Sequence, residues 1–232
     1  MKIYVGFSIF IINMPYRRVV FANQCFYHIV NRGVGSKIIF QESIDYQRAL
    51  DLISYYRFTP ETAFTFFNRL TSLEKNKYFK KQTEALVKIY AYCLMPNHFH
   101  LLLSQESDKG ISKYMGNWQN AYARHFNIKH KKKGYLFESN FKAKLIEEDR
   151  IFYHVSRYIH LNPSTAKLTE IDQLKNYQWS SLPIYLENKQ NTMVDTGLIL
   201  GHFQRPKRYQ KYVYNNAAYQ RSLGKIKALM LD

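Results

Sequence analysis

Two apolar runs, Ile89–Met95 and Phe99–Leu103, follow one another in this chain and are joined at a Pro-Asn pair. This pattern indicates two strands connected by a tight turn. His98 and His100 open the second run, and residues two apart in a strand point to the same face. Neutral imidazole is a common ligand of divalent metals, so the two histidines are a candidate metal site. A pair of histidines buried in the core is the alternative interpretation.

The order of the remaining elements constrains the fold. It reads strand, helix, strand, strand, helix, strand, helix, which predicts an α+β protein with a ferredoxin-like antiparallel sheet, helices on one face and one extra helix. A further helical segment is expected at about 61–86. The predicted strands are Gln24–Asn31, Val87–Met95, Phe99–Ser104 and Lys142–Ile146, with a short edge strand at Ile38–Phe40. The predicted helices run from Ser43 or Asp45 through Tyr56, over Ile111–His130 and over Arg150–Leu161. The last of these helices is expected to be capped by Asp149 and to stop at Asn162-Pro163.

The charge of the chain points to a polyanionic partner. There are 34 Lys and Arg against 17 Asp and Glu, a formal net charge of +17, with 20 Tyr and 16 Phe. Nucleic acid is the first candidate and an anionic membrane surface the second. Aromatic rings among cations suit single strands, because bases stack on rings while cations follow phosphates. Cys25 and Cys93 form no zinc or disulfide pattern and are expected to be buried thiols of a reduced, cytosolic protein.

Several separated motifs carry a resemblance to a known family. They are MPNHFHLLL at Met95–Leu103, RYIHLNPSTA at Arg157–Ala166, and, around them, MPYRR, CFYHIVNRG, GYLFESNFKAKLIEED and NYQWSS. In this order they resemble the REP-associated tyrosine transposases, which belong to the single-tyrosine HUH transposases. The resemblance implies the HUH nuclease fold and an enzyme that cleaves and rejoins single-stranded DNA at hairpins through a 5′-phosphotyrosine.

The resemblance also implies roles for individual residues. Tyr158 is the expected nucleophile, and His98, His100 and Asn162 are the expected ligands of Mg²⁺ or Mn²⁺. Helical spacing agrees with this, because Tyr158 and Asn162 are four residues apart and share a face. His154 shares the same face and is a candidate to support the site from behind the ligands.

Basic residues near these motifs are candidates for contact with nucleic acid. The run Lys131, Lys132 and Lys133 is either a solvated loop or a phosphate-binding segment, and Lys142 and Arg157 are further candidates. His28 projects from the first strand and is expected in the core. Of the aromatic residues, the stripe along the helix at 111–130 is also expected to be core.

The expected organisation has three parts. Residues 1–13 are an apolar extension too short to span a bilayer, and translation is expected to start at Met14. Residues 14–175 form the catalytic domain, with the helical insertion at about 61–86, and residues 176–232 form a basic extension. The expected partner is hairpin-bearing single-stranded DNA, with no membrane, a monomer or a homodimer as the assembly, and a cytoplasmic, nucleoid-associated location. Two alternatives stay open: a catalytically silent DNA or RNA hairpin-binding protein, and a metal phosphodiesterase that uses water.

Overall fold

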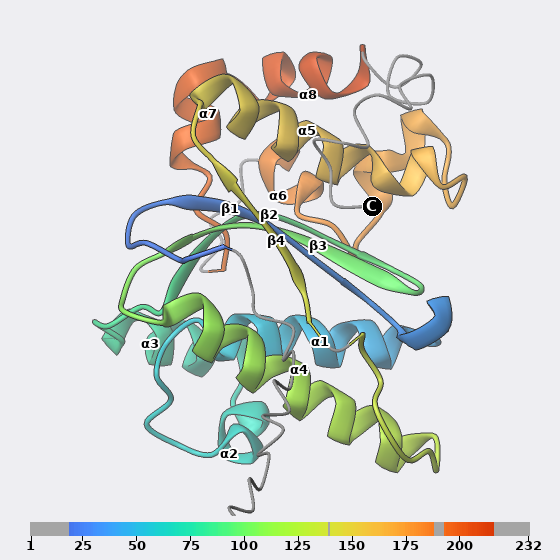
Figure 1. The fold of residues 1–232 in the computed structure, drawn as a ribbon. Helices are drawn as coiled ribbons and strands as arrows, with labels where there is room; N and C mark the ends of the chain where they lie inside the picture. The colour runs from blue at the N-terminus through green and yellow to red at the C-terminus, as the bar shows by residue number, and fades with distance from the viewer. Residues whose placement is uncertain (1–18, 139, 188–192, 216–232) are drawn as a thin grey trace, which may run out of the picture.

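A single antiparallel sheet organises the protein. The computed structural model describes residues 19–138, 140–187 and 193–215, so the predicted extension at 1–13 lies outside the described residues. The sheet has the strand order β2-β3-β1-β4, and every neighbouring pair is antiparallel (Figure 1). Its strands are β1 (Phe26–Arg32), β2 (Val87–Met95), β3 (His98–Gln105) and β4 (Lys142–Ile146).

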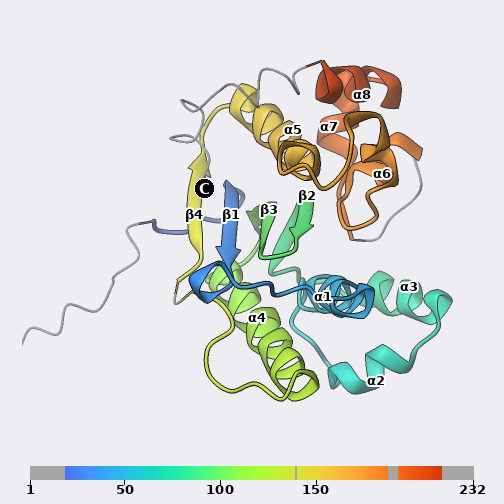
Figure 2. The same cartoon turned by 90° about the vertical axis from the view of Figure 1, so that its right-hand side faces the viewer.

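Helices cover both faces of this sheet. The predicted α+β class and antiparallel sheet are confirmed, and α1 and α4 lie together on one face as expected (Figures 1 and 2). Helix α5 lies on the opposite face, where the shorter C-terminal helices pack around it. The expectation of helices on one face only is therefore wrong, because the interior strands are buried on both faces and need cover on each. The helices are α1 (Ser43–Tyr55), α2 (Phe64–Arg69), α3 (Ser72–Lys81), α4 (Gly110–Lys129), α5 (Asp149–Thr165), α6 (Leu182–Glu187), α7 (Gly197–Phe203) and α8 (Pro206–Tyr214), with 3₁₀ turns at Val34–Ser36 and Ile171–Asn176.

The alternation of side chains along β3 separates the core from the candidate site. Phe99 points to the α4 face, where its ring lies 4.7 Å from that of Trp118. His100 points to the α5 face, where its ring lies 5.6 Å from that of Tyr158. Because both faces are covered, every residue of β3 except His98 is buried, and the polar side chains of this strand lie in the interior together with the apolar ones. The aromatic stripe of α4 is buried, as predicted.

The predicted stop of α5 at Asn162-Pro163 is wrong, because the helix continues one turn further with Pro163 inside it. Proline removes one helical hydrogen bond, but here it lies close to the helix end, where little of the helix remains to be disrupted. The end is closed by a Schellman motif: the Leu168 N–H donates to the Pro163 carbonyl at 2.8 Å, and the Lys167 N–H donates to the Ser164 carbonyl at 3.1 Å. Asn162 is therefore helical.

The segment expected to be an insertion does form helices. Helices α2 and α3 pack beside α1, and Tyr55, Phe67 and Phe79 make a small aromatic cluster separate from the main core. The Thr71 side chain accepts from the Glu74 N–H, and the Glu74 carboxylate accepts from the Thr71 N–H. This capping box explains where α3 begins.

Two smaller expectations need correction. Ile38–Phe40 is not a strand, because the N–H groups of Ile39 and Phe40 both donate to the Pro96 carbonyl in the β2–β3 turn, at 2.8 and 3.0 Å. Cys25 is only half-buried, whereas Cys93 is fully buried as expected. Within residues 19–138, 140–187 and 193–215, no helix is long and apolar enough to cross a membrane.

Candidate active site

Three of the predicted site residues meet on the α5 face of the sheet. The rings of His98 and His100 lie 5.0 Å apart, since both residues project from the same face of β3. Tyr158 reaches them from α5 and places its ring 5.6 Å from that of His100, nearly perpendicular to it. Tyr158 is only 7% exposed, so its position is set by packing between helix and sheet.

Each histidine is held through its Nδ1 atom. The Nδ1 of His98 donates to the Oδ1 of Asn97 at 2.6 Å, and the Nδ2 of Asn97 donates to the Ser36 carbonyl at 3.4 Å. The Nδ1 of His100 lies 3.0 Å from the Nε2 of His28. Nε2 is therefore the ring nitrogen that either histidine could offer to a metal, and a hydrogen bond at the other nitrogen is the usual way to orient a histidine ligand.

The electrostatics of the site keep both imidazoles neutral. The pKa of His98 is lowered to about 4, mainly by burial and to a smaller extent by the positive charge of the nearby Arg32. Burial also holds the pKa of His100 well below its usual range, and the neighbouring His98 and His28 act in the same direction. Since only a neutral imidazole has a lone pair for a metal, both groups are in the metal-binding form at neutral pH.

Asn162 is the candidate for a third donor beside the two histidines. It lies one turn after Tyr158 on α5, is 6% exposed, and its Nδ2 has no hydrogen-bond partner among the described residues. An amide oxygen and two imidazole nitrogens would hold Mg²⁺ or Mn²⁺ with positions left for phosphate and water. In the ranges that the structure describes, no cluster of three or more His, Cys, Asp or Glu forms a metal site, so such a set would depend on Asn162.

Other tyrosines that could compete for the role of nucleophile lie elsewhere. The Tyr122 hydroxyl donates to the Ile39 carbonyl on the opposite face of the sheet. The ring of Tyr153 stacks on that of His202 in α7, with centroids 4.0 Å apart. Of these three tyrosines, only Tyr158 has a ring contact with His100.

A buried polar chain fixes α5, the helix that carries Tyr158. His160 lies between the Tyr209 hydroxyl of α8 and the Ser181 hydroxyl, with both contacts at 2.7 Å. Tyr209 also donates to the Ser156 hydroxyl of α5 at 3.1 Å, and Ser181 accepts from the Tyr92 N–H of β2 at 2.9 Å. Burial lowers the pKa of His160 to about 3, so this link is neutral. The chain therefore ties α5 to both α8 and the sheet.

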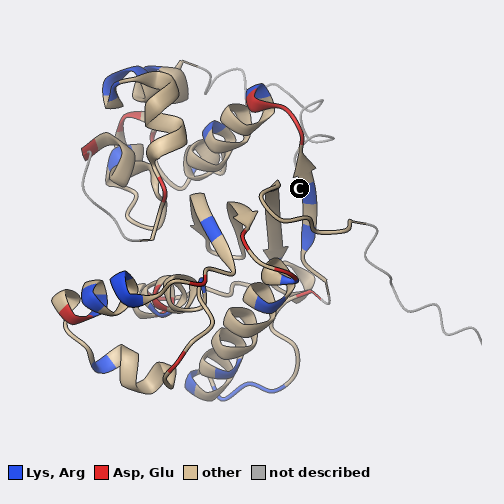
Figure 3. Cartoon of the chain, turned by 90° about the vertical axis from the view of Figure 1, so that its left-hand side faces the viewer, with Lys and Arg blue, Asp and Glu red and all other residues tan. Residues whose placement is uncertain are grey.

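The predicted contacts with nucleic acid have different outcomes. Lys131, Lys132 and Lys133 are exposed, but they follow the end of α4 and lie on the sheet face away from α5 (Figures 1 and 3). Lys142 is exposed at the start of edge strand β4. Its register partner in β1, Val30, is also the register partner of His100 in β3. These four lysines are accessible to a polyanion.

Arg157 and His154 do not have the surroundings expected of them. Arg157 is 7% exposed, its guanidinium lies 4.6 Å from the ring centre of Tyr212, and it contacts the His154 Nδ1 at 2.7 Å. Both side chains therefore pack between α5 and α8. Arg157 is therefore less accessible to nucleic acid than expected, and the recorded contacts of His154 are with Arg157 and Tyr212 and not with His98 or His100.

Two residues of β1 also lie next to the histidine pair, although they were not expected to be part of the site. His28 is fully buried, but beside His100 and Tyr158 and not in an apolar core. Arg32 is the direct register partner of His98. Their spacing of four residues along a strand puts both on one face, which is a signal that the sequence contains. Which face of β1 meets α5, however, depends on the tertiary fold.

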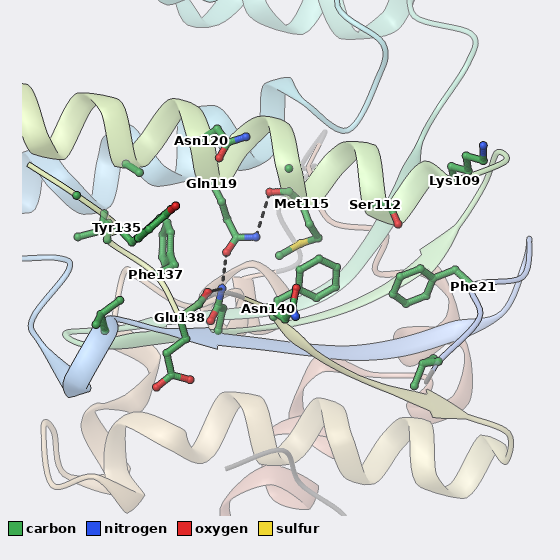
Figure 4. A pocket seen from close by; sticks show the side chains of 18 of the residues that line it. Phe21, Lys109, Ser112, Met115, Gln119, Asn120, Tyr135, Phe137, Glu138 and Asn140 are labelled. Atoms are coloured by element: carbon green, nitrogen blue, oxygen red, sulfur yellow. Dashed lines mark hydrogen bonds between the residues drawn. The ribbon is translucent and has the colours of Figure 1, made fainter. Parts of the chain in front are cut away.

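The opposite face of the sheet contains a separate cavity of about 1380 Å³. Figure 4 shows it between α4 and the segment that leads into β4, with Gln119, Met115 and Tyr135 among its lining residues. The Asn31 Nδ2 donates to the Gln119 Oε1 at 2.7 Å at its floor. The sheet separates this cavity from the histidine pair.

The fold and the site define a class of protein: an antiparallel α+β protein whose sheet presents a His-x-His pair to a tyrosine on the covering helix. The family model for IS200-like transposases matches residues 21–162, more than half of the chain. The chain belongs to this transposase family. The predicted relation to the single-tyrosine transposases is confirmed at the level of the family.

Two solved structures are similar to the chain. A REP-associated tyrosine transposase bound to a REP hairpin is similar with a TM-score of 0.50 and 14% identity, covering 79% of this chain and 93% of that chain. A putative transposase from Deinococcus radiodurans has a TM-score of 0.35 and 14% identity, covering 62% of this chain and 93% of its own. The first likeness supports the fold. No curated protein sequence matches the chain significantly.

Proposed function

We propose that the protein is a single-strand DNA endonuclease and strand transferase of the transposase type, which cleaves at DNA hairpins with Mg²⁺ or Mn²⁺ through a 5′-phosphotyrosine. The observation that carries this proposal is the contact of Tyr158 with His100, which forms a pair of neutral, oriented histidines with His98. Membership in the IS200-like transposases supports the reaction class. The hairpin substrate is suggested by the structural relative, which was solved bound to a REP hairpin.

The residues of the site suit this reaction. The Tyr158 oxygen would attack the scissile phosphorus, forming a P–O bond to tyrosine and breaking the bond to the 3′-oxygen. The phenol loses its proton and the departing 3′-oxygen gains one, so the step leaves a free 3′-hydroxyl and no net charge change. When bound by His98, His100 and Asn162, the divalent cation would supply charge neutralisation at the phosphate. Because the phosphotyrosine conserves the bond energy, a 3′-hydroxyl can later rejoin strands without a nucleotide cofactor.

Binding and chemistry depend on different parts of the protein. Most of the affinity for DNA is expected from exposed Lys and Arg, because the net charge is +17 and phosphate contacts dominate affinity. The histidine pair acts only on one phosphate. Loss of a histidine should therefore remove cleavage without removing binding.

The test uses labelled hairpins with single-stranded flanks, taken from DNA next to the gene, and Mn²⁺. Wild-type protein is expected to cleave them, while His98→Ala and His100→Ala lower the cleavage rate by about 10²-fold or more and keep hairpin affinity. His125→Ala on α4, on the other face of the sheet, is the matched control and should cleave like wild type. Binding without cleavage by wild type would support the catalytically silent alternative, and cleavage at wild-type rate by His100→Ala would refute the metal site.

A further inference from the structure

His28 contacts both the candidate metal ligand and the candidate nucleophile. Its side chain is fully buried, and its Nε2 lies 3.0 Å from the Nδ1 of His100. The two imidazole rings are close to parallel, at 18°, with centroids 5.2 Å apart. Its ring also meets that of Tyr158 edge-on at 6.0 Å. His28 therefore lies on the Nδ1 side of the His100 ring, and a metal would bind on the Nε2 side.

The sheet register produces this contact. His28 pairs with Leu102 of β3, so its side chain lies on the same face as His100 and diagonal to it. Strand β1 is an interior strand, with β3 on one side and β4 on the other, so the backbone position of His28 is fixed by pairing on both sides. The same face of β1 carries Arg32, opposite His98. The contact is thus a consequence of strand pairing and not of a mobile loop.

The protons of the pair can be assigned if His100 binds a metal. A metal at Nε2 of a neutral His100 requires the proton of that ring to be on Nδ1. The 3.0 Å contact must then run from the His100 Nδ1–H to the His28 Nε2, which accepts. His98 has the matching arrangement, because its Nδ1–H donates to the Asn97 Oδ1 at 2.6 Å. Each histidine of the pair thus has its own acceptor from the chain.

We propose that His28 is a positioning residue of the metal site: its Nε2 accepts the Nδ1–H of His100 and so fixes the tautomer and the ring angle with which His100 presents Nε2. This inference rests on the proposed function, since it concerns the same metal. It assigns to β1 a part in the site that was expected of β3 and α5 alone. Partners of this kind commonly contribute 10- to 100-fold to metal affinity.

The test compares two substitutions at the same position. His28→Phe keeps an aromatic ring but has no acceptor, whereas His28→Gln can place an amide oxygen close to the position of Nε2. Mn²⁺ affinity is measured directly by calorimetry and by the electron paramagnetic resonance signal of free Mn²⁺, in the absence of DNA. Circular dichroism and hairpin affinity are recorded for each variant, and His125→Phe on α4 serves as the matched control.

We expect His28→Phe to bind Mn²⁺ about 10- to 100-fold more weakly than wild type and His28→Gln to recover most of that loss, with hairpin affinity unchanged in both. A purely structural role would affect both variants through folding and would not give this recovery. Equal Mn²⁺ affinity in wild type and a folded His28→Phe would overturn the role of His28 while leaving the proposed function intact. Absence of Mn²⁺ binding to wild type would instead overturn the metal-dependent function, and the role of His28 with it.

Discussion

Arg32 is the residue whose position most clearly suggests an unassigned contact with the substrate. It is the direct register partner of His98, so the two side chains leave the same face of adjacent strands. It is half-buried and has no acidic partner among the described residues. Its charge also contributes to the lowered pKa of His98 and His100. A guanidinium at this position, beside the proposed metal site, is well suited to a phosphate oxygen, which it can bind through two donors.

We expect Arg32→Gln to lower the rate of single-turnover hairpin cleavage by about 10-fold or more, because a donor to the reacting phosphate is lost. Hairpin affinity should change little, since one of many cations is removed. Rapid-quench cleavage assays with saturating protein measure this rate. Arg150→Gln at the exposed start of α5 is the control, and equal rates for wild type and Arg32→Gln would exclude the contact.

Residue spacing predicted part of this site and not the rest. The His98–His100 and Tyr158–Asn162 spacings are local, because a strand repeats every two residues and a helix every 3.6. The environments of His28 and Arg157 are set by strand pairing and by α8, which are not local. The burial of Arg157 next to Tyr158 therefore could not be predicted from its neighbours in the motif.

At the scale of elements, α5 is the part of the fold on which catalysis would depend. The sequence predicted where α5 begins to within one residue, but not its last turn, because the Schellman closure depends on Lys167 in a left-handed conformation. His160 links this helix to α8 and to β2 through Tyr209 and Ser181. The polar chain is buried, so a hydrogen bond that is lost from it would not be replaced by one to water.

We expect His160→Leu to lower the free energy of unfolding by about 2–3 kcal/mol, because two buried hydrogen bonds are lost and their partners are left less satisfied. Cleavage should fall as well, since α5 loses the contacts that place Tyr158, while hairpin affinity should be kept. Urea denaturation gives the free energy, and His202→Leu, at an exposed position of α7, is the control. A stability equal to that of wild type would show that the chain does not hold the helix.

At the scale of the whole molecule, buried histidines make stability depend on pH. The pKa is lowered to about 3 for His28 and His160, and to about 4 for His98, in each case mainly by burial. In the unfolded chain these groups titrate near 6.5. As the pH falls below 6.5, the unfolded chain therefore binds protons that the folded protein excludes, and the free energy of unfolding decreases.

We expect the metal-free protein to lose about 1 kcal/mol per pH unit for each of these histidines between pH 6.5 and pH 5, because the unfolded groups become fully protonated only towards the lower end of this window. Urea denaturation at several pH values in this window measures the slope. His28→Phe removes one such group, so its slope should be smaller than that of wild type. A free energy of unfolding that stays constant from pH 7 to pH 5 would contradict the neutral, buried state of the three histidines.

The most direct test of the central claim is to locate the covalent bond between the protein and cleaved DNA. Wild-type protein, a hairpin with a single-stranded flank and Mn²⁺ are mixed, the complex is denatured, and peptide mass mapping identifies the modified residue. The account predicts a 5′-phosphate on Tyr158 and a free 3′-hydroxyl on the other product, with no adduct and no cleavage by Tyr158→Phe, which lacks only the hydroxyl. An adduct on Tyr153 or Tyr122, or cleavage by the wild-type protein without any adduct, would contradict it.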